Sequence, residues 1–336
     1  MQDNLEKLYR EALVWDAHAG VFPDPGIDLN LLDEWPQLGA TYLSINVGFD
    51  VMEWQETMAT LAAYRRWVTA LGDRFVLVND TRDIDRARAE NKFALSFDIE
   101  GMNALNGDIN MVSAYHTLGV RQMLFAYNLN NVAAGGCHDQ DTGLTDFGRA
   151  VVDEMNRVGM VIDCSHSAYK TTMEAMQRST APVIFSHSNA LALADHGRNI
   201  RDEQIRACAA GGGVIGINGL SLFLGDKEKA KAETVARHVA YIADLVGHEH
   251  VGISLDFDPA ENIDDGSGNV NSFSNVLEED PEYWPPEAGY DRPIDFLPLS
   301  SLPGVCDELL QTGFTEAELA GILGGNFRRV AELVWK

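Results

Sequence analysis

The sequence predicts an α/β protein that folds as a single (β/α)8 barrel of the TIM type, and three observations lead to that prediction. Short apolar runs alternate with longer helical patterns through most of the chain. Most of these runs are almost continuously apolar, which is typical of parallel strands covered on both faces. The chain has 336 residues, of which 46% are hydrophobic, and this length suits one barrel domain over residues 1–336.

The predicted strands are runs rich in apolar and β-branched residues, with helical patterns between them. The strands span residues 13–18, 41–47, 93–100, 120–127, 159–166, 182–188, 213–218 and 251–257. The run FVLVN (75–79) is an extra candidate, so the strand count stays open. Amphipathic patterns predict helices over residues 1–16, 54–71, 146–159, 168–179 and 232–247. The last stretch, 314–336, predicts two short helices that close the barrel, the first capped by Thr315.

One long segment, residues 258–298, does not fit the alternation of strands and helices. It is acidic, rich in Pro, Gly and Asn, and contains Tyr283, Trp284 and Tyr290. A loop of this length is typical of a lid or a binding loop, and a flexible surface excursion is the alternative. We treat it as a candidate lid of the same domain, because no repeat or second domain is visible.

The charge and the cysteines narrow the class of protein. The chain has 51 acidic and 25 basic residues, a formal net charge of -26, so nucleic acid and anionic membranes are poor partners. The cysteines form no C-x-x-C pair, which argues against a disulfide framework or a zinc ribbon; they are Cys137, Cys164, Cys208 and Cys306. With no signal peptide pattern and no long apolar run, we expect a cytoplasmic protein.

Polar and titratable residues gather at one end of the predicted strands. Six of them fall at or close to the C-terminal end of a strand: His18, Glu100, Tyr127, His166, His187 and Asp256. Barrel enzymes build their active sites from the loops at that end. A histidine with a structural role would more naturally lie in the middle of a helix or strand. The placement therefore predicts an active site.

Two imidazoles and a carboxylate among these residues form a ligand set suited to Zn2+ or a similar divalent ion. His166 and His187 end successive strands and so lie on neighbouring loops, while Glu100 ends a strand elsewhere on the rim. This set leaves positions for water, as catalytic zinc requires. His18 adds a nitrogen from the first strand, and Glu100 is placed to bridge two ions.

Segments that carry these residues resemble the membrane (renal) dipeptidase family of zinc metallopeptidases, within the amidohydrolase-type barrel superfamily. They are DIEGMNAL (98–105), TGLTDFGRAVVDEMNRVGMVIDCSH (142–166), PVIFSHSNA (182–190), RNIRDEQI (198–205), GISLDFD (252–258) and GGNFRRV (324–330). The resemblance covers nearly the whole chain. It implies a dipeptidase with zinc at the strand ends, and it suggests a homodimer.

The resemblance also implies a role for each site residue. The metal ligands that it implies are His18, Glu100, His166 and His187. Glu100 corresponds to the carboxylate that bridges two zinc ions, with His18 on the first ion and the other two histidines on the second. Arg198 corresponds to the arginine that holds the substrate's carboxylate, and Asp256 to the acid that passes a proton to the leaving amine.

Position 20 departs from the family pattern. The family has an aspartate two residues after the first histidine, and this chain has Gly20 there. The first metal site then keeps His18 and a share of Glu100, which is fewer than the three protein ligands usual for catalytic zinc. A centre with one ion is therefore favoured, and a centre with two ions is the alternative. Asp24 and Asp28 are candidate replacement ligands, although turn and helix-cap roles beside the nearby prolines are favoured.

Four further residues lie near the site in the sequence. Tyr127 stands where the mammalian-type enzymes carry a substrate-contacting histidine, and its neutral hydroxyl can donate a hydrogen bond to the substrate. Asp16 is a candidate for orienting His18 or another ligand. Cys137 and His138 lie close in sequence to the Tyr127 loop, and a structural role in that loop is favoured over ligation.

We therefore expect a metal-dependent hydrolase that cleaves an amide bond in a dipeptide or similar small substrate with a free carboxylate. Asp256 would act as general base and then general acid, and Arg198 would pair with the carboxylate. Two alternatives stay open. One is an amidohydrolase for N-acyl amino acids or small cyclic amides. The other is a catalytically silent relative that binds a small molecule, against which the full set of site residues argues.

Overall fold

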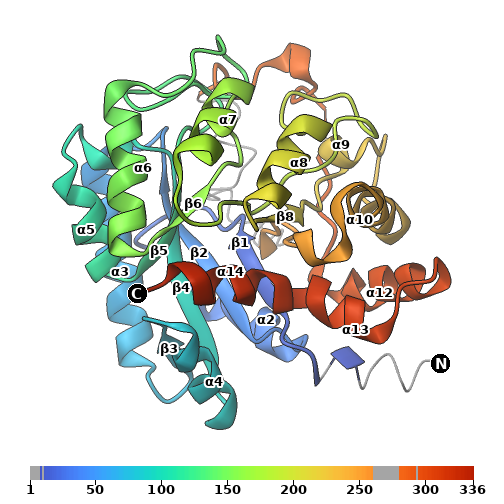
Figure 1. Ribbon diagram of the computed structural model, residues 1–336. Coiled ribbons are helices and arrows are strands. Elements are labelled where there is room, and N and C mark those ends of the chain that lie inside the picture. Colours follow the sequence, from blue (N-terminus) through green and yellow to red (C-terminus); the bar gives the residue numbers. More distant parts are fainter. Residues whose placement is uncertain (1–7, 10, 260–279, 293) are drawn as a thin grey trace.

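The computed structural model describes residues 8–9, 11–259, 280–292 and 294–336. Within this part of the chain, nine parallel strands form one sheet in the order β1, β2, β4, β5, β6, β7, β8, β9, with β3 paired to β4 beside this path. They are β1 (Trp15–Ala19), β2 (Tyr42–Phe49), β3 (Phe75–Leu77), β4 (Phe93–Glu100), β5 (Val120–Leu124), β6 (Val161–Asp163), β7 (Ile184–Phe185), β8 (Val214–Ile217) and β9 (Val251–Ile253). The eight strands of the main path curl into a nearly closed barrel, which confirms the predicted fold (Figure 1).

The barrel closes where β1 meets β9. At this seam the backbone N–H of Gly20 donates to the carbonyl of Phe257, at 3.2 Å. The extra candidate run at 75–79 does form a strand, β3, but outside the main path of eight. The described strands after β5 are shorter than predicted, because the backbone turns away from the barrel before the polar residues that follow.

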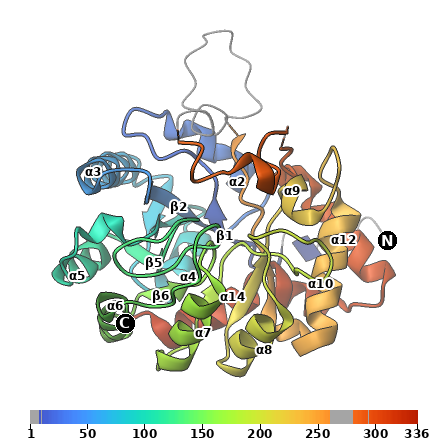
Figure 2. The same cartoon turned by 90° about the horizontal axis from the view of Figure 1, so that it is seen from above.

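Helices pack around the outside of the barrel (Figure 2). They are α2 (Glu34–Gln37), α3 (Trp54–Ala70), α4 (Thr81–Ala89), α5 (Asn110–Thr117), α6 (Asp146–Val158), α7 (Tyr169–Arg178), α8 (Asp202–Ala210), α9 (Ser221–Leu224), α10 (Ala232–Val246), α12 (Leu302–Gln311), α13 (Glu316–Ala320) and α14 (Asn326–Val334). The helices predicted at 54–71, 146–159, 168–179 and 232–247 are confirmed as α3, α6, α7 and α10. Thr315 caps α13 as predicted, since its hydroxyl accepts from the N–H of Glu318. Half of the helix predicted over residues 1–16 lies outside the described residues, and its last two residues, Trp15 and Asp16, belong to strand β1 instead, so the predicted helix extends too far.

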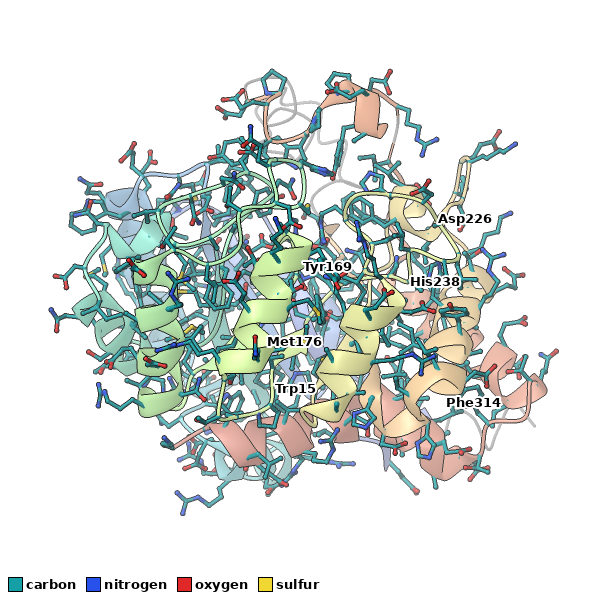
Figure 3. All side chains as sticks on the ribbon, turned by 45° about the horizontal axis from the view of Figure 1, so that its top comes forward. Trp15, Tyr169, Met176, Asp226, His238 and Phe314 are labelled. Atoms are coloured by element: carbon teal, nitrogen blue, oxygen red, sulfur yellow. The ribbon has the colours of Figure 1, made fainter. Side chains whose placement is uncertain are left out.

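The two ends of the barrel interior differ in chemistry. At the N-terminal end of the strands, apolar side chains such as Trp15 and Tyr42 pack on Phe327 of α14. Gly252 leaves room for this ring, because a Cβ there would lie 2.3 Å from it. Helix α14 crosses this end, and Figure 3 shows Trp15 there (Figures 1 and 3). The lower end is therefore a packed plug, and the open end is the one where the strands finish.

Two further findings concern membrane-spanning helices and the cysteines. No described helix is long and apolar enough to cross a membrane. All four cysteines are free thiols, in agreement with the absence of a disulfide framework from the sequence pattern.

Candidate metal centre

Five side chains from different strands converge at the open end of the barrel. Glu100 is the last residue of β4 and His18 lies in β1, while His166, His187 and Asp256 follow β6, β7 and β9 by two or three residues. His166 and Asp256 have left-handed backbone conformations, with φ of 61° and 55°. Such conformations are uncommon for residues with side chains and often mark functional sites, because surrounding structure must hold them in place.

A bulge aims His18 into the barrel. The pairing register of β1 with β2 shifts between Asp16 and Ala19. Without this shift, His18 would share a face with Asp16, whose carboxylate points away and accepts from the indole N–H of Trp35 at 2.8 Å. The shift turns the imidazole inward instead, where Nδ1 lies 3.0 Å from Oδ1 of Asp98.

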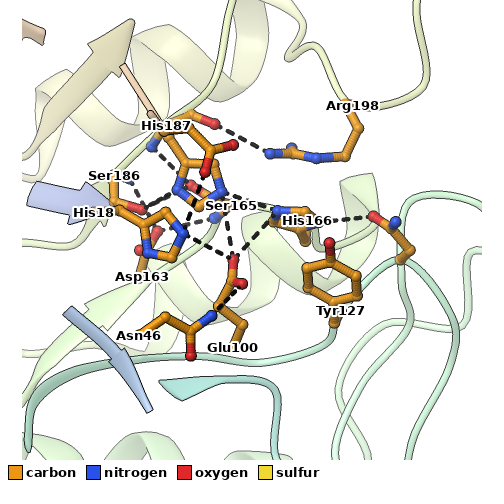
Figure 4. Close-up of polar contacts among 12 residues, drawn as sticks. His18, Asn46, Glu100, Tyr127, Asp163, Ser165, His166, Ser186, His187 and Arg198 are labelled. Carbon is orange, nitrogen blue, oxygen red and sulfur yellow. Dashed lines mark hydrogen bonds and ion pairs between the residues drawn. The ribbon is translucent and has the colours of Figure 1, made fainter. Parts of the chain in front are cut away.

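One carboxylate oxygen lies at the centre of the cluster. Oε1 of Glu100 is 3.6 Å from Nε2 of His18, 3.4 Å from Nε2 of His166 and 3.5 Å from Nε2 of His187 (Figure 4). The Nε2 atoms of His166 and His187 are 2.9 Å apart. The other oxygen, Oε2, accepts a hydrogen bond from the side-chain amide of Asn46 at 2.6 Å.

The outer nitrogen of each imidazole faces a group that fixes its tautomer. Nδ1 of His18 faces the carboxylate of Asp98, which can only accept. Nδ1 of His166 lies 2.7 Å from Oδ1 of Asn128, and that amide donates through Nδ2 to the carbonyl of Tyr283. Nδ1 of His187 lies 2.7 Å from the hydroxyl of Ser186, which also hydrogen-bonds Asp163. With its proton on Nδ1, a neutral imidazole at each of these positions would present the lone pair of Nε2 to Glu100, as metal ligation requires.

This arrangement fits a divalent cation. Oε1 of Glu100 is buried and has no hydrogen-bond partner among the described residues, although three nitrogens surround it. A buried acceptor without a donor is costly unless a cation takes the donor's place. Two ligands on one tetrahedral zinc ion lie about 3.3 Å apart, given bonds of about 2.0 Å. The 3.4 and 3.5 Å separations of Glu100 from His166 and His187 match that spacing.

Burial and charge set the protonation of the cluster. Burial lowers the pKa of His166 and of His187 well below the ordinary range, with a further lowering by the Arg198 guanidinium, so both are neutral. Burial also disfavours the charged form of His18, but Glu100 and the neighbouring carboxylates outweigh it and raise the pKa of His18 well above its usual value. Burial raises the pKa of Glu100 to about 8. Because a neutral imidazole is the form that ligates metal, an ion bound by His18 would displace the second proton of that ring.

Comparison with known proteins agrees with this geometry. The family model described as membrane dipeptidase (peptidase family M19) matches residues 26–280. The chain belongs to the membrane dipeptidase family. The match includes Glu100, His166, His187 and Asp256, whereas His18 and Gly20 precede it. The resemblance inferred from the sequence is thus confirmed.

Individual membrane dipeptidase relatives are distant. Dipeptidase tcpJ of Claviceps purpurea is 32% identical over 227 residues, which are 66% of this chain and 53% of that protein. An uncharacterized dipeptidase of Schizosaccharomyces pombe is 28% identical over 292 residues, 84% of this chain and 62% of that protein. The chain therefore spans between half and two thirds of the length of these curated relatives.

Solved structures share the fold over nearly the full chain. An amidohydrolase from Pseudomonas aeruginosa has a TM-score of 0.87 and 25% identity, covering 98% of this chain and 99% of its own. A metallopeptidase from Rhodobacter sphaeroides, solved with a phosphinate mimic of the dipeptide L-Ala-D-Ala, has a TM-score of 0.77 and 20% identity, covering 96% and 99%. The barrel is thus one already known from crystal structures.

Asp256 lies beside His18 and Gly20. Its Oδ1 is 3.4 Å from Nε2 of His18, and its Oδ2 accepts from the side-chain amide of Asn218 at 2.9 Å. A Cβ at Gly20 would lie 2.7 Å from the carbonyl oxygen of Asp256 and 2.8 Å from Oδ1. The space that a side chain at position 20 would need is therefore filled by Asp256.

The residues weighed as alternative ligands have other partners. Asp24 accepts from the N–H of Gly26 in a turn, and Asp28 caps a short 3-10 helix by accepting from the N–H of Asn30. The favoured turn and cap roles are thus observed. Both oxygens of Asp16 are hydrogen-bonded, to Trp35 and to the hydroxyl of Ser254, which in turn accepts from the backbone N–H of His18. Asp16 therefore holds the backbone of His18, while Asp98 orients its ring.

Tyr127 and Arg198 flank the centre in different ways. The Tyr127 ring stacks on His166, with centroids 4.2 Å apart, and it lines the pocket over Glu100. Arg198 is buried and donates through Nη2 to the carbonyl of His187 at 3.1 Å, while its Nε has no hydrogen-bond partner among the described residues. Arg198 lines a neighbouring cavity of about 280 Å³ that shares His166 with the metal pocket. The His166 side chain thus lines both cavities.

Cys137 and His138 serve the loop rather than the cluster. The Cys137 thiol lies 3.4 Å from Oδ1 of Asn128, and burial raises the pKa of this thiol to about 12. Nε2 of His138 lies 3.0 Å from the hydroxyl of Tyr290. Neither side chain is among the groups at Glu100, as the sequence favoured.

Aromatic side chains form the wall of the metal pocket. The cavity beside the centre measures about 60 Å³ and is lined by Phe22, Phe49, Phe223, Trp284, Tyr290 and Phe296 in addition to the polar cluster. Three of these come from the described part of the 258–298 segment, which lies at the open end of the barrel (Figure 1). Residues 260–279 of that segment lie outside the described residues. The described part forms pocket wall, which is the behaviour expected of a binding loop.

Sequence reasoning missed the residues that orient the ligands. Asp98 and Asn46 carried a detectable signal, because Asp98 lies two residues before Glu100 in β4 and Asn46 two residues after Ser44 in β2, so each shares a face of its strand with another polar residue. Asn128 and Asn218 lie in irregular segments after β5 and β8. No periodicity marks such positions, so only the structure identifies them.

Proposed function

We propose that this protein is a metal-dependent hydrolase that cleaves an amide bond in a dipeptide or a similarly small substrate with a free carboxylate. The observation that carries the proposal is the buried Oε1 of Glu100, which lacks a hydrogen-bond donor and faces three imidazole Nε2 atoms. Membership in the membrane dipeptidase family supports the same reaction class.

Glu100, His166 and His187 would hold the divalent ion, most simply Zn2+, and this is the one-ion site that the sequence favours. A bound ion would lower the pKa of water and polarise the scissile carbonyl. The chain's own residues keep the ligands in place. Asn46 fixes the Glu100 carboxylate, Asn128 holds the His166 ring, and Ser186 holds the His187 ring.

Asp256 would carry the proton. Its side chain lines the metal pocket and is fixed by Asn218, so it is in place to take a proton from the attacking water. The same carboxyl would then give the proton to the departing nitrogen. A single group that accepts and returns a proton is sufficient for amide hydrolysis.

Arg198 would bind the substrate's carboxylate in the cavity next to the metal pocket. A buried guanidinium whose Nε has no hydrogen-bond partner in the described part of the chain is suited to an anionic ligand. Since the two cavities share His166, a short substrate can place its carboxylate near Arg198 and its scissile bond near Glu100. Tyr127, stacked on His166, would contact the same substrate.

The aromatic pocket wall favours a second candidate, an amidohydrolase for N-acyl amino acids. Among the described residues, the acidic ones that line this pocket are Glu100 and Asp256, and both have metal or proton roles in the proposed reaction. An apolar acyl group packs against aromatic rings without needing an anionic partner, whereas an ammonium group does need one. Cyclic amides follow the same argument.

A substrate panel tests the proposal. The purified protein is loaded with Zn2+ and assayed against dipeptides, N-acyl amino acids and cyclic amides, with a chelator-treated sample as control. We expect hydrolysis that requires the metal and a free carboxylate on the substrate. Activity confined to dipeptides would remove the second candidate. No hydrolysis despite full metal loading would favour a silent binding relative. The homodimer, the cytoplasmic location and the lid role of the 258–298 segment stay predictions.

A further inference from the structure

We propose that Asp256 supplies the carboxylate that position 20 lacks, so that His18, Glu100 and Asp256 together hold a second divalent ion. The inference deepens the proposed function and rests on it, since it presupposes an ion at Glu100, His166 and His187. It replaces the expectation of a single ion, which counted only the ligands visible in the sequence.

The distances on the His18 side match those on the other side of Glu100. Nε2 of His18 is 3.6 Å from Oε1 of Glu100 and 3.4 Å from Oδ1 of Asp256. These values are close to the 3.4 and 3.5 Å that separate Glu100 from His166 and His187. Both sets agree with the spacing of about 3.3 Å between two ligands of one tetrahedral zinc ion.

In the neutral form that ligates metal, His18 has a lone pair on Nε2 that faces two carboxylates. Asp98 accepts the Nδ1 proton, so Nε2 in the neutral tautomer has no hydrogen to offer Glu100 or Asp256. A divalent ion held by Nε2 would take the place of the second proton of this ring and would offset the charge of the two carboxylates that face it. With Asp256, this side has three protein ligands, the usual minimum for a zinc ion that is retained.

Gly20 is what lets Asp256 reach this place. A Cβ at position 20 would lie 2.7 Å from the Asp256 carbonyl oxygen and 2.8 Å from its Oδ1, closer than nonbonded atoms approach. A side chain at position 20 and the observed position of Asp256 therefore exclude each other. The carboxylate on this side of the centre comes from across the β1–β9 seam instead of from β1.

Asp256 retains an oxygen for proton transfer. Oδ1 faces His18, whereas Oδ2 is held by Asn218. A carboxylate that ligates through one oxygen still has the second as an acceptor. The proposed ligand role and the proposed proton role are therefore compatible.

The other carboxylates near the N-terminus are engaged elsewhere. Asp24 and Asp28 accept from backbone N–H groups in their own turns. Asp16 accepts from Trp35 and Ser254. Among the described residues, Asp256 is thus the carboxylate placed to complete the His18 side.

Metal content of the full chain tests the inference independently of catalysis. Wild type, Asp256→Asn and Asp24→Asn are loaded with Zn2+, freed of excess ion and measured by elemental mass spectrometry. We expect about two ions per chain in wild type and in Asp24→Asn, and about one in Asp256→Asn. Circular dichroism shows whether each variant is folded.

Variants at position 20 keep the test decisive if Asp256→Asn fails to fold. Gly20→Ala adds one methyl group where Asp256 lies, so it should also lower the content to about one ion. The double variant Gly20→Asp with Asp256→Gly should restore the metal content to about two ions per chain, because the carboxylate then comes from β1.

The outcomes separate this inference from the proposed function. About two ions in folded Asp256→Asn, or about one in wild type with metal-dependent hydrolysis intact, would overturn the second site and leave the proposed function standing. Absence of any bound ion in loaded wild type would overturn both.

Discussion

The two sides of the Glu100 carboxylate are built differently. On one side, His166 and His187 follow β6 and β7, which are paired in the sheet. On the other, His18 and Asp256 come from β1 and β9, which meet at the seam where Gly20 bonds to Phe257. Strand pairing fixes the spacing of the first pair, whereas the backbone hydrogen bond from Gly20 to Phe257 ties together the two segments that carry the second. A ligand missing from one strand of a seam is therefore replaceable from the other.

Removal of the carboxylate that both sides share should have the largest effect. Glu100→Gln leaves the Asn46 contact but replaces the central anion by a neutral amide, so neither side retains its ion. We expect metal content near zero and a fall in kcat/KM of about 10³-fold or more. Elemental analysis and a hydrolysis assay measure both. Retention of the ions by this variant would mean that the cluster is not organised around Glu100.

Asp256→Asn and His18→Ala separate two roles on the seam side. Both remove a proposed ligand of the second ion, but only the first removes the proposed proton carrier. We expect kcat to fall by about 10²–10⁴-fold for Asp256→Asn. The fall in kcat for His18→Ala should be smaller than that for Asp256→Asn by a factor of at least about 10. Steady-state kinetics with saturating Zn2+ make the comparison. Equal losses would remove Asp256 from proton transfer, and unchanged turnover would remove it from the reaction.

The groups that orient the imidazoles should affect one side each. Asn128→Ala frees the His166 ring, and Asp98→Asn weakens the hold on His18. We expect each to weaken metal binding by about 10–100-fold, at the first ion for Asn128→Ala and at the second for Asp98→Asn. Competition with a chelator of known affinity resolves the two ions. Loss of the same ion in both variants would contradict a two-sided centre.

The smallest expected effect is on the pH dependence of stability, and it comes from substituting a histidine away from the metal centre. His238, in the middle of α10, accepts from the N–H of Ala190, and burial lowers its pKa from 6.5 to about 4. Because the unfolded chain binds this proton more readily, His238 contributes stability above pH 6.5 that is lost as the pH falls toward 4. The contribution is at most about 3 kcal/mol. Denaturant unfolding of metal-free wild type and His238→Asn across this range should give a flatter pH dependence for the variant. Activity at neutral pH should not change.

The fold and the composition of the site were largely predictable from the sequence. Strands buried on both faces leave apolar runs, and a polar residue at the end of such a run stands out, as Glu100 and His187 do. His238 illustrates the converse, since it lies in mid-helix and has backbone partners. The strand boundaries were less accurate, because the chain leaves the sheet before His166 and Asp256, whose left-handed backbone has no clear sequence signal.

The contacts that orient the site were not predictable, for two physical reasons. Asn128 and Asn218 act from loops, where the direction of a side chain depends on the backbone path. Gly20 and Asp256 are far apart in the chain and meet only because the barrel closes. The sequence reveals that position 20 lacks a carboxylate, but the reason becomes visible only with the seam in view.

The most direct test of the metal centre is X-ray diffraction from Zn2+-loaded crystals, with anomalous differences recorded at the zinc absorption edge. We expect one anomalous peak about 2.0 Å from Oε1 of Glu100 and from Nε2 of both His166 and His187. We expect a second peak between His18 and Asp256. Occupancy at the first place alone would confine the chemistry to one ion. Zinc bound elsewhere on the chain, with neither place occupied, would contradict the assignment of this cluster as a metal centre.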